Sequence, residues 1–182
     1  MFNLDTFLSD CHSALAETNP MLAIQELIGR AVATPMDLDA AFGPYSKGGT
    51  KVLHHGDQLT VLHIVWPPGI SIFPHDHLMW AAIGIHAGIE DNTFFRRTDA
   101  GLDTMGTVRM APGDARSLPA DAIHAVANPE SLPTAALHVY GGDFFAAKRS
   151  QFDEETHAEK PYDKAHANRV FEQANERWLG QS

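Results

Sequence analysis

The chain has 182 residues, of which 44% are hydrophobic and 20% charged, and its formal net charge at pH 7 is -10. This composition is typical of one folded globular domain and excludes a disordered chain. An acidic surface repels phosphate backbones and anionic lipids, and no apolar run approaches the roughly 20 residues of a membrane helix, so we expect neither a nucleic-acid partner nor a membrane partner.

The first ten residues carry acids but no Lys or Arg, which does not fit a signal peptide. The single cysteine, Cys11, allows no disulfide within the chain, and a cytoplasmic location is therefore expected. Cys11 lies on an apolar stripe and is interpreted as a small buried hydrophobe rather than a nucleophile.

Residues 1–42 are predicted to form a helical N-terminal segment. Their apolar residues recur at helical spacing, and Asn19-Pro20 and Thr34-Pro35 each pair a capping residue with a proline at the first helical position. A loop rich in Gly, Pro and Ser follows at 42–49.

Short runs rich in Val, Ile, Leu and Phe then alternate with Gly, Pro and Asp clusters, which favours a β-sandwich or barrel over residues 50–145. We expect strands at 51–55, 59–66, 70–75, 77–87, 92–97, 106–110, 114–118, 123–127 and 134–140. The remaining segment, 150–182, is predicted to be a charged surface stretch up to Asp163 followed by a C-terminal helix that ends at Gly180.

The sequence His75-Asp76-His77 is the first candidate functional feature. Residues two apart on a strand point to the same face, so both imidazoles can reach one metal ion while Asp76 points away. A His-x-His pair alone is weak support for a metal site, because such pairs also occur on surface strands.

Two longer blocks extend this feature. In the first, Gly69 is followed after five residues by His75-Asp76-His77 and later by Gly88. In the second, Gly113 is followed after five residues by Pro119-Ala120-Asp121, then His124, then Asn128. Together the blocks resemble the two motifs of the cupin superfamily.

The resemblance implies a mainly β fold, a double-stranded β-helix (cupin/jelly-roll) barrel with N-terminal helices and a C-terminal helix, in a single cupin domain over 1–182. It also implies a metal ion held by His75, His77 and His124. Two positions depart from the family pattern: Ala81 stands where the family has a glutamate ligand, and Asp121 replaces a glycine. The missing carboxylate leaves a neutral three-histidine face with open positions, which can take substrate and dioxygen directly.

A neutral three-histidine set is similar to that of cysteine dioxygenase and its bacterial thiol dioxygenase relatives. The stretches 65–69, 74–77 and 84–88, Trp80, and Leu137-His138-Val139-Tyr140 resemble the pattern of that family. The resemblance implies that His138 and Tyr140 line the pocket as catalytic residues, and their spacing of two places them on one face.

The chain also departs from this second family. Ala136 replaces the serine of the pocket, and Ala81-Ala82 stand near the family's crosslinking cysteine, so no Cys–Tyr crosslink is expected. The family's carboxylate-binding arginine has only Lys51 near its place. The candidates for substrate binding are Lys51, Met79, and whichever of Arg96 and Arg97 faces inward. A surface ion pair explains Arg96 equally well.

The leading hypothesis is a mononuclear non-haem Fe(II) dioxygenase that oxidises a small substrate, for which the resemblance implies a thiol carboxylate such as cysteine or 3-mercaptopropionate. Fe(II) is the expected metal, and Zn, Mn and Ni are the alternatives. Other metal-dependent chemistry (carbon–carbon cleavage, isomerisation or hydrolysis) and a non-catalytic metal- or ligand-binding cupin stay open. A homodimer paired through an edge strand also stays open beside a monomer.

Overall fold

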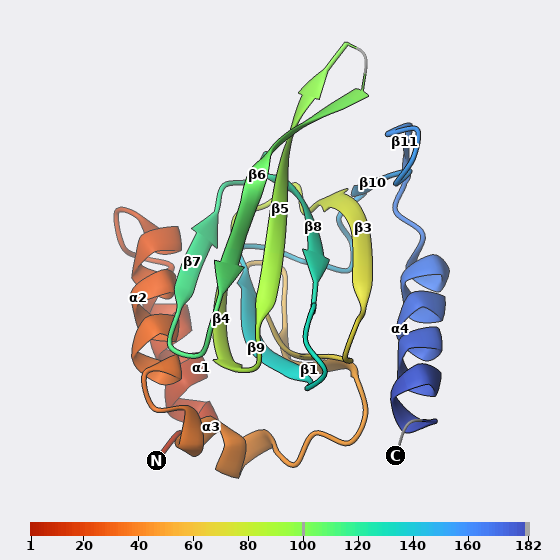
Figure 1. Cartoon of the computed structure of the whole chain (residues 1–182). Coiled ribbons are helices and arrows are strands. Elements are labelled where there is room, and N and C mark those ends of the chain that lie inside the picture. The colour runs from red at the N-terminus through yellow and green to blue at the C-terminus, as the bar shows by residue number, and fades with distance from the viewer. Residues whose placement is uncertain (100, 181–182) are drawn as a thin grey trace.

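The computed structural model of the chain describes residues 1–99 and 101–180, so residue 100 and the last two residues of the predicted domain lie outside the described part. Its strands form two antiparallel sheets that face one another (Figure 1). The first sheet, in the order β1-β2-β9-β4-β7, comprises β1 (Gly49–His55), β2 (Thr60–Trp66), β9 (Thr134–Tyr140), β4 (Ala81–Ala87) and β7 (Ala115–Leu118). The second, in the order β11-β10-β3-β8-β5-β6, comprises β11 (Glu159–Pro161), β10 (Ser150–Phe152), β3 (Ser71–Asp76), β8 (Ile123–Ala127), β5 (Glu90–Thr98) and β6 (Gly101–Met110).

The chain crosses repeatedly from one sheet to the other, which gives the double-stranded β-helix predicted from the sequence. Every residue of β2 is buried, because one face of the strand packs inside the barrel and the other lies under helices. Leu62 and Ile64 belong to the interior core, whereas Val61 packs in the layer below the helices. The side chains of β2 therefore alternate between the two layers with the period of two that is expected for a strand.

The predicted N-terminal helices are present as α1 (Leu4–Ala14), α2 (Pro20–Val32) and α3 (Pro35–Phe42), and they cover the outer face of the first sheet (Figure 1). Asn19 caps α2 as expected, its side chain accepting a hydrogen bond from the Leu22 amide at 3.3 Å. Helix α2 packs closely on β4 at Gly84, where a Cβ atom would lie 2.1 Å from Ile28 Cγ2. Cys11 is fully buried under these helices, and burial raises the pKa of its thiol to about 12.

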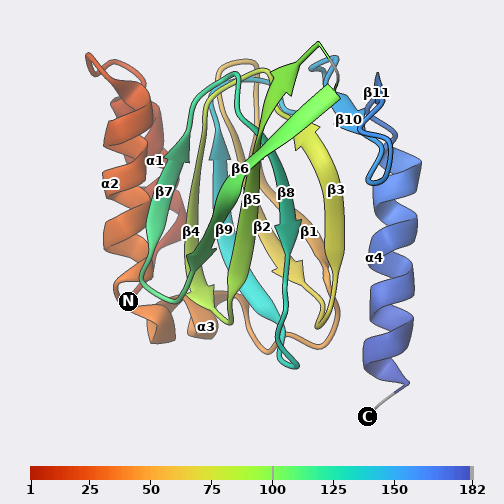
Figure 2. The same ribbon diagram turned by 45° about the horizontal axis from the view of Figure 1, so that its top comes forward.

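The predicted C-terminal helix is α4 (Lys164–Leu179), which lies beside β3 on the side of the barrel opposite α1 and α2 (Figure 2). Phe171 stacks on Trp66 with ring centroids 5.3 Å apart. Asn175 accepts a hydrogen bond from the Gly48 amide at 2.7 Å and donates one to the Gly48 carbonyl at 3.0 Å. Helix α4 is thus attached to the barrel at two places along its length.

Two local predictions were wrong. The strand expected over 77–87 begins only at Ala81, because the chain turns from one sheet to the other there and Leu78 adopts a left-handed conformation with φ of 56°. The stretch 150–163 contains β10 and β11, each three residues long, which is too short for a periodic pattern. Among the described residues, no helix combines the length and the apolar character needed to cross a membrane.

Candidate metal centre

Three histidines converge inside the barrel from two paired strands. His75 lies near the end of β3 and pairs in register with His124 on β8, and His77 lies just beyond the end of β3. His77 Nε2 is 3.3 Å from His75 Nε2 and 3.3 Å from His124 Nε2. All three side chains are buried, and their ligand atoms lie within 4.8 Å of one another. In residues 1–99 and 101–180 this is the one group of three or more His, Cys, Asp or Glu side chains that meets this spacing.

Hydrogen bonds leave the Nε2 atoms of two of these histidines free to bind a metal. His75 Nδ1 is 3.0 Å from the Phe73 carbonyl oxygen, and His124 Nδ1 is 2.8 Å from Asn92 Oδ1. Both oxygens can only accept, so each Nδ1 carries the proton and each Nε2 presents a lone pair. The Nε2 lone pairs of His75 and His124 both face His77 Nε2 at 3.3 Å, so one cation can be bound by all three histidines.

The electrostatics and the spacing both fit a divalent metal. Burial lowers the pKa of His75 to about 4 and holds those of His77 and His124 well below the usual value, with neighbouring histidines adding to the effect. The imidazoles are therefore neutral at neutral pH, which is the form that binds metal. At a metal–nitrogen distance of about 2.1 Å, ligand nitrogens lie ~3.0 Å apart in octahedral and ~3.4 Å apart in tetrahedral geometry, and the two measured distances fall between these values.

A buried carboxylate, Glu90, links this cluster to the predicted catalytic pair. Glu90 is fully buried; its Oε2 accepts a hydrogen bond from Trp66 Nε1 at 2.6 Å, and its Oε1 accepts one from Asn92 Nδ2 at 2.9 Å. The second of these bonds orients the Asn92 amide so that its oxygen faces His124. Glu90 Oε2 also lies 3.8 Å from His138 Nε2.

The structure places His138 and Tyr140 beside the cluster, on the inner face of β9. His138 Nδ1 is 3.2 Å from the Tyr140 hydroxyl, and the Tyr140 ring centroid is 5.0 Å from that of His77. Burial raises the pKa of Tyr140, so its phenol stays protonated and can donate a hydrogen bond. His138 Nε2 is buried and has no hydrogen-bond partner within the described residues. Tyr140 thus packs against His77 of the cluster, and His138 packs against Tyr140.

Arg149 is the buried cation of the site, and the sequence analysis did not select it. Its side chain lies between two aromatic rings, with the guanidinium carbon 3.9 Å from the Phe144 centroid and 4.0 Å from the Tyr162 centroid. Arg149 is 8% exposed, and its Nη1 is buried without a hydrogen-bond partner among the described residues. Because the rings cover both faces of the guanidinium, its N–H groups can bind only at the edge.

Arg149, His75 and Tyr140 share a cavity of about 380 Å³ between the barrel and α4. A buried N–H group of a cation without a hydrogen-bond partner is costly, and a carboxylate bound at Arg149 Nη1 removes that cost. One histidine of the cluster, His75, and a candidate anion-binding group therefore line the same space.

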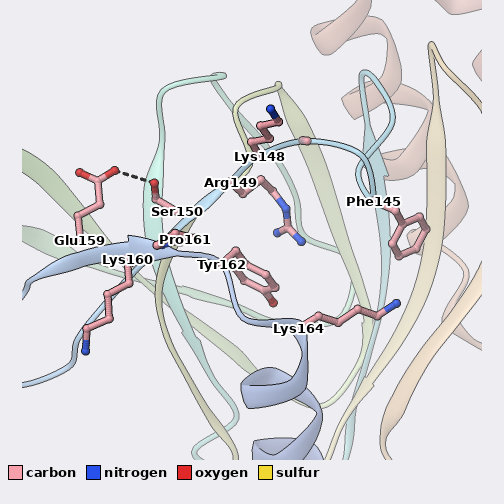
Figure 3. A pocket seen from close by; sticks show the side chains of 10 residues that line it. Phe145, Lys148, Arg149, Ser150, Glu159, Lys160, Pro161, Tyr162 and Lys164 are labelled. Atoms are coloured by element: carbon pink, nitrogen blue, oxygen red, sulfur yellow. Dashed lines mark hydrogen bonds between the residues drawn. The ribbon is translucent and has the colours of Figure 1, made fainter.

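A second, more open depression of about 620 Å³ also includes Arg149 in its lining (Figure 3). Figure 3 shows Arg149 extending toward Tyr162, while Lys148 extends in the opposite direction. The depression is lined by one acid, Glu159, and by four cationic residues: Lys148, Arg149, Lys160 and Lys164. In a chain with a net charge of -10, this concentration of cations attracts anions to the vicinity of the cavity.

The three residues proposed from the sequence for substrate binding are not brought to this cavity. Lys51 is exposed on the outer face of β1, with its Nζ 5.6 Å from the Phe42 centroid. Arg96 is exposed and pairs with Asp103 at 3.0 Å. Met79 packs against the barrel core, and it does not line the 380 Å³ cavity.

Comparison with known proteins reveals similarity at the level of the fold. No family model matches the chain. One similar solved structure is a conserved protein with a double-stranded β-helix domain from Klebsiella pneumoniae, 15% identical over 65% of this chain and 89% of that chain, with a TM-score of 0.48. A cupin family protein from Methanocaldococcus jannaschii is 16% identical over 57% and 87% of the two chains, with a TM-score of 0.48. A cupin superfamily protein from Desulfitobacterium hafniense is 19% identical over 56% and 84%, with a TM-score of 0.45. Identities of this size concern the fold and carry no reaction or substrate to this chain.

Proposed function

We propose that the protein is a mononuclear non-haem Fe(II) dioxygenase of the cupin type that oxidises an organic acid bearing a thiol. The observation that carries this proposal is that His75, a member of the cluster of three neutral histidines, lines the same cavity as Arg149, whose buried Nη1 has no hydrogen-bond partner among the described residues. A divalent metal and a cation placed together favour a substrate with two anionic groups, a thiolate for the metal and a carboxylate for the arginine.

The ligand set supports redox chemistry with direct substrate binding. Three neutral nitrogens leave the full charge of a divalent ion uncompensated, and Ala81 adds no carboxylate to the set. Fe(II), when bound, supplies the chemistry that activates dioxygen. The overall reaction balances as RSH + O₂ → RSO₂⁻ + H⁺, in which sulfur loses four electrons and dioxygen gains them, so no external reductant is required.

The residues of the chain have separate tasks in this proposal. Arg149 binds the substrate carboxylate and fixes the distance of the thiol from the histidines. Tyr140 donates a hydrogen bond toward the reacting groups, and His138 holds the Tyr140 hydroxyl in place through Nδ1. The apolar cavity walls exclude bulk water from the reacting atoms.

The proposal is tested by oxygen consumption. The protein is purified without oxygen, loaded with Fe(II) and mixed with a panel of thiol acids and the matching hydroxy acids, with His124→Ala as the metal-site control. We expect oxygen uptake with a thiol acid, equimolar sulfinate, and no uptake in His124→Ala. Arg149→Gln is expected to raise KM by about 10- to 100-fold, because a charge-assisted bidentate contact is lost. The matched control is Lys148→Gln, which removes an exposed cation that lines the outer depression.

The alternatives give different results. Turnover of an acid that needs the metal but not oxygen would replace the dioxygenase proposal with Lewis-acid chemistry. Tight binding of acids with no product under either atmosphere would leave a binding protein.

A further inference from the structure

The cavity that His75 shares with Arg149 is larger than a small thiol acid requires. Its volume of about 380 Å³ corresponds to roughly a dozen water molecules at about 30 Å³ each. An acid such as 3-mercaptopropionate has about six non-hydrogen atoms and displaces at most about half of that water. Water left against apolar walls is unfavourable, so the remaining space fits a larger ligand better.

The spare volume extends in one direction, along α4. The cavity lining includes Lys164 at the start of the helix and Asn175 near its end, a separation of ~16 Å at 1.5 Å per residue. Lys164 lies at the Arg149 end, with its Nζ 5.4 Å from the Phe145 centroid, and Asn175 lies at the other end, bonded to Gly48. A three-carbon acid is only ~5 Å long, so it fills the Arg149 end alone.

The walls of this extension are mainly apolar. Leu62, Ile64 and Ile72 line it from the barrel, and Ala167 and Phe171 line it from α4. At the outer end, Lys47 and Glu172 provide one cation and one anion. The charges there balance, so nothing at that end favours a second anionic group on the ligand.

We propose that the substrate is a monocarboxylic acid with an extended apolar body of about six or more carbons, whose carboxylate contacts Arg149 and whose body lies between α4 and the inner face of the barrel. Ala167 and Phe171 then determine specificity for chain length. This inference rests on the proposed function for the placement of the acid group, but it concerns binding and can be measured without turnover.

The test is calorimetric binding of propionate, butyrate, hexanoate and octanoate to protein loaded with Zn(II), which supports no oxidation. Each added methylene is expected to tighten Kd about three- to fourfold, or about 50-fold from propionate to hexanoate. Ala167→Phe narrows the extension and is expected to abolish this rise with chain length. Ala165→Phe makes the same change on the exposed face of α4 and is expected to preserve the increase in affinity with chain length. A Kd that is constant or weakens along the wild-type series overturns the inference without reference to any variant.

Oxygen uptake separates this inference from the proposed function. Oxidation of 3-mercaptopropionate together with a flat binding series would refute the long-chain substrate and leave the dioxygenase in place. A steep binding series with no oxidation of any thiol acid would support the long-chain ligand and refute the dioxygenase.

Discussion

Replacing Glu90 by glutamine is expected to weaken metal binding from a distance, although Glu90 contacts no ligand nitrogen. Both carboxylate oxygens of Glu90 accept hydrogen bonds, one from Trp66 and one from Asn92. Glutamine has one oxygen and one amide nitrogen at the same places, so one of the two donors must face a donor. If Asn92 rotates to relieve this conflict, its amide nitrogen faces His124 Nδ1 and favours the tautomer with the proton on Nε2, where the metal binds.

The magnitude follows from the bonds involved. The loss of one hydrogen bond to a buried charged group costs about 1.5–3 kcal/mol, which is roughly 10- to 150-fold in an equilibrium constant. Groups that orient metal-bound histidines affect metal affinity by a similar 10- to 100-fold. We therefore expect Glu90→Gln to raise the Kd for Zn(II) or Fe(II) by about 10- to 100-fold.

The assay is competition for the metal with a chromophoric chelator, with Glu17→Gln at an exposed site as the matched control. Nitrogen chemical shifts of the His124 imidazole, measured by NMR in the metal-free protein, report the tautomer directly. A metal Kd within twofold of wild type, with the proton of His124 still on Nδ1, would refute the role assigned to Glu90.

Three further predictions follow from other contacts. Tyr140→Phe is expected to slow turnover by at least about tenfold with metal content unchanged, measured by oxygen uptake and metal analysis; equal turnover would remove the hydroxyl from the reaction. His63 is buried against His86, with Nε2 atoms 3.0 Å apart, and burial lowers its pKa to about 3. In the unfolded chain a histidine has a pKa of about 6.5 and binds more protons than the folded chain below that pH, so stability is lost as pH falls. Between pH 7 and 4.5 we expect the unfolding free energy of His63→Gln, measured by urea titration, to fall by roughly 2 kcal/mol less than that of wild type. Equal losses in the two proteins would contradict this. Asn175→Ala removes both hydrogen bonds to Gly48 and is expected to lower the unfolding free energy by about 1–3 kcal/mol and to speed hydrogen exchange in α4, whereas unchanged exchange would show that Phe171 alone holds the helix.

The metal cluster could be predicted from the sequence because its residues carry local signals. His75 and His77 are two residues apart, and His124 lies in a second block of fixed spacing. The helices were equally predictable, because caps such as Asn19 and apolar stripes are encoded within a few residues. The mainly β fold with helices at both ends followed from these local patterns.

The surroundings of the cluster depend on contacts that no local pattern contains. Arg149 is buried because the short strand β10 that follows it pairs with β3, where Gln151 lies opposite His75. Glu90 lies outside the strand expected at 92–97, yet the pairing of β5 with β8 places Glu90 and Asn92 inside the barrel. Lys51, by contrast, lies on the outer face of an edge strand. Pairing between distant segments, rather than periodicity, thus selects the residues that surround the metal.

The most direct test of the metal centre is iron stoichiometry in wild type and in His77→Ala. His77 is the histidine whose Nε2 lies 3.3 Å from both of the others, so removal of its side chain opens the cluster at its centre. After anaerobic loading with Fe(II) and desalting, we expect about one iron per wild-type chain and almost none in His77→Ala, with the fold of the variant verified by circular dichroism. Equal iron in a folded His77→Ala protein would contradict the three-histidine centre.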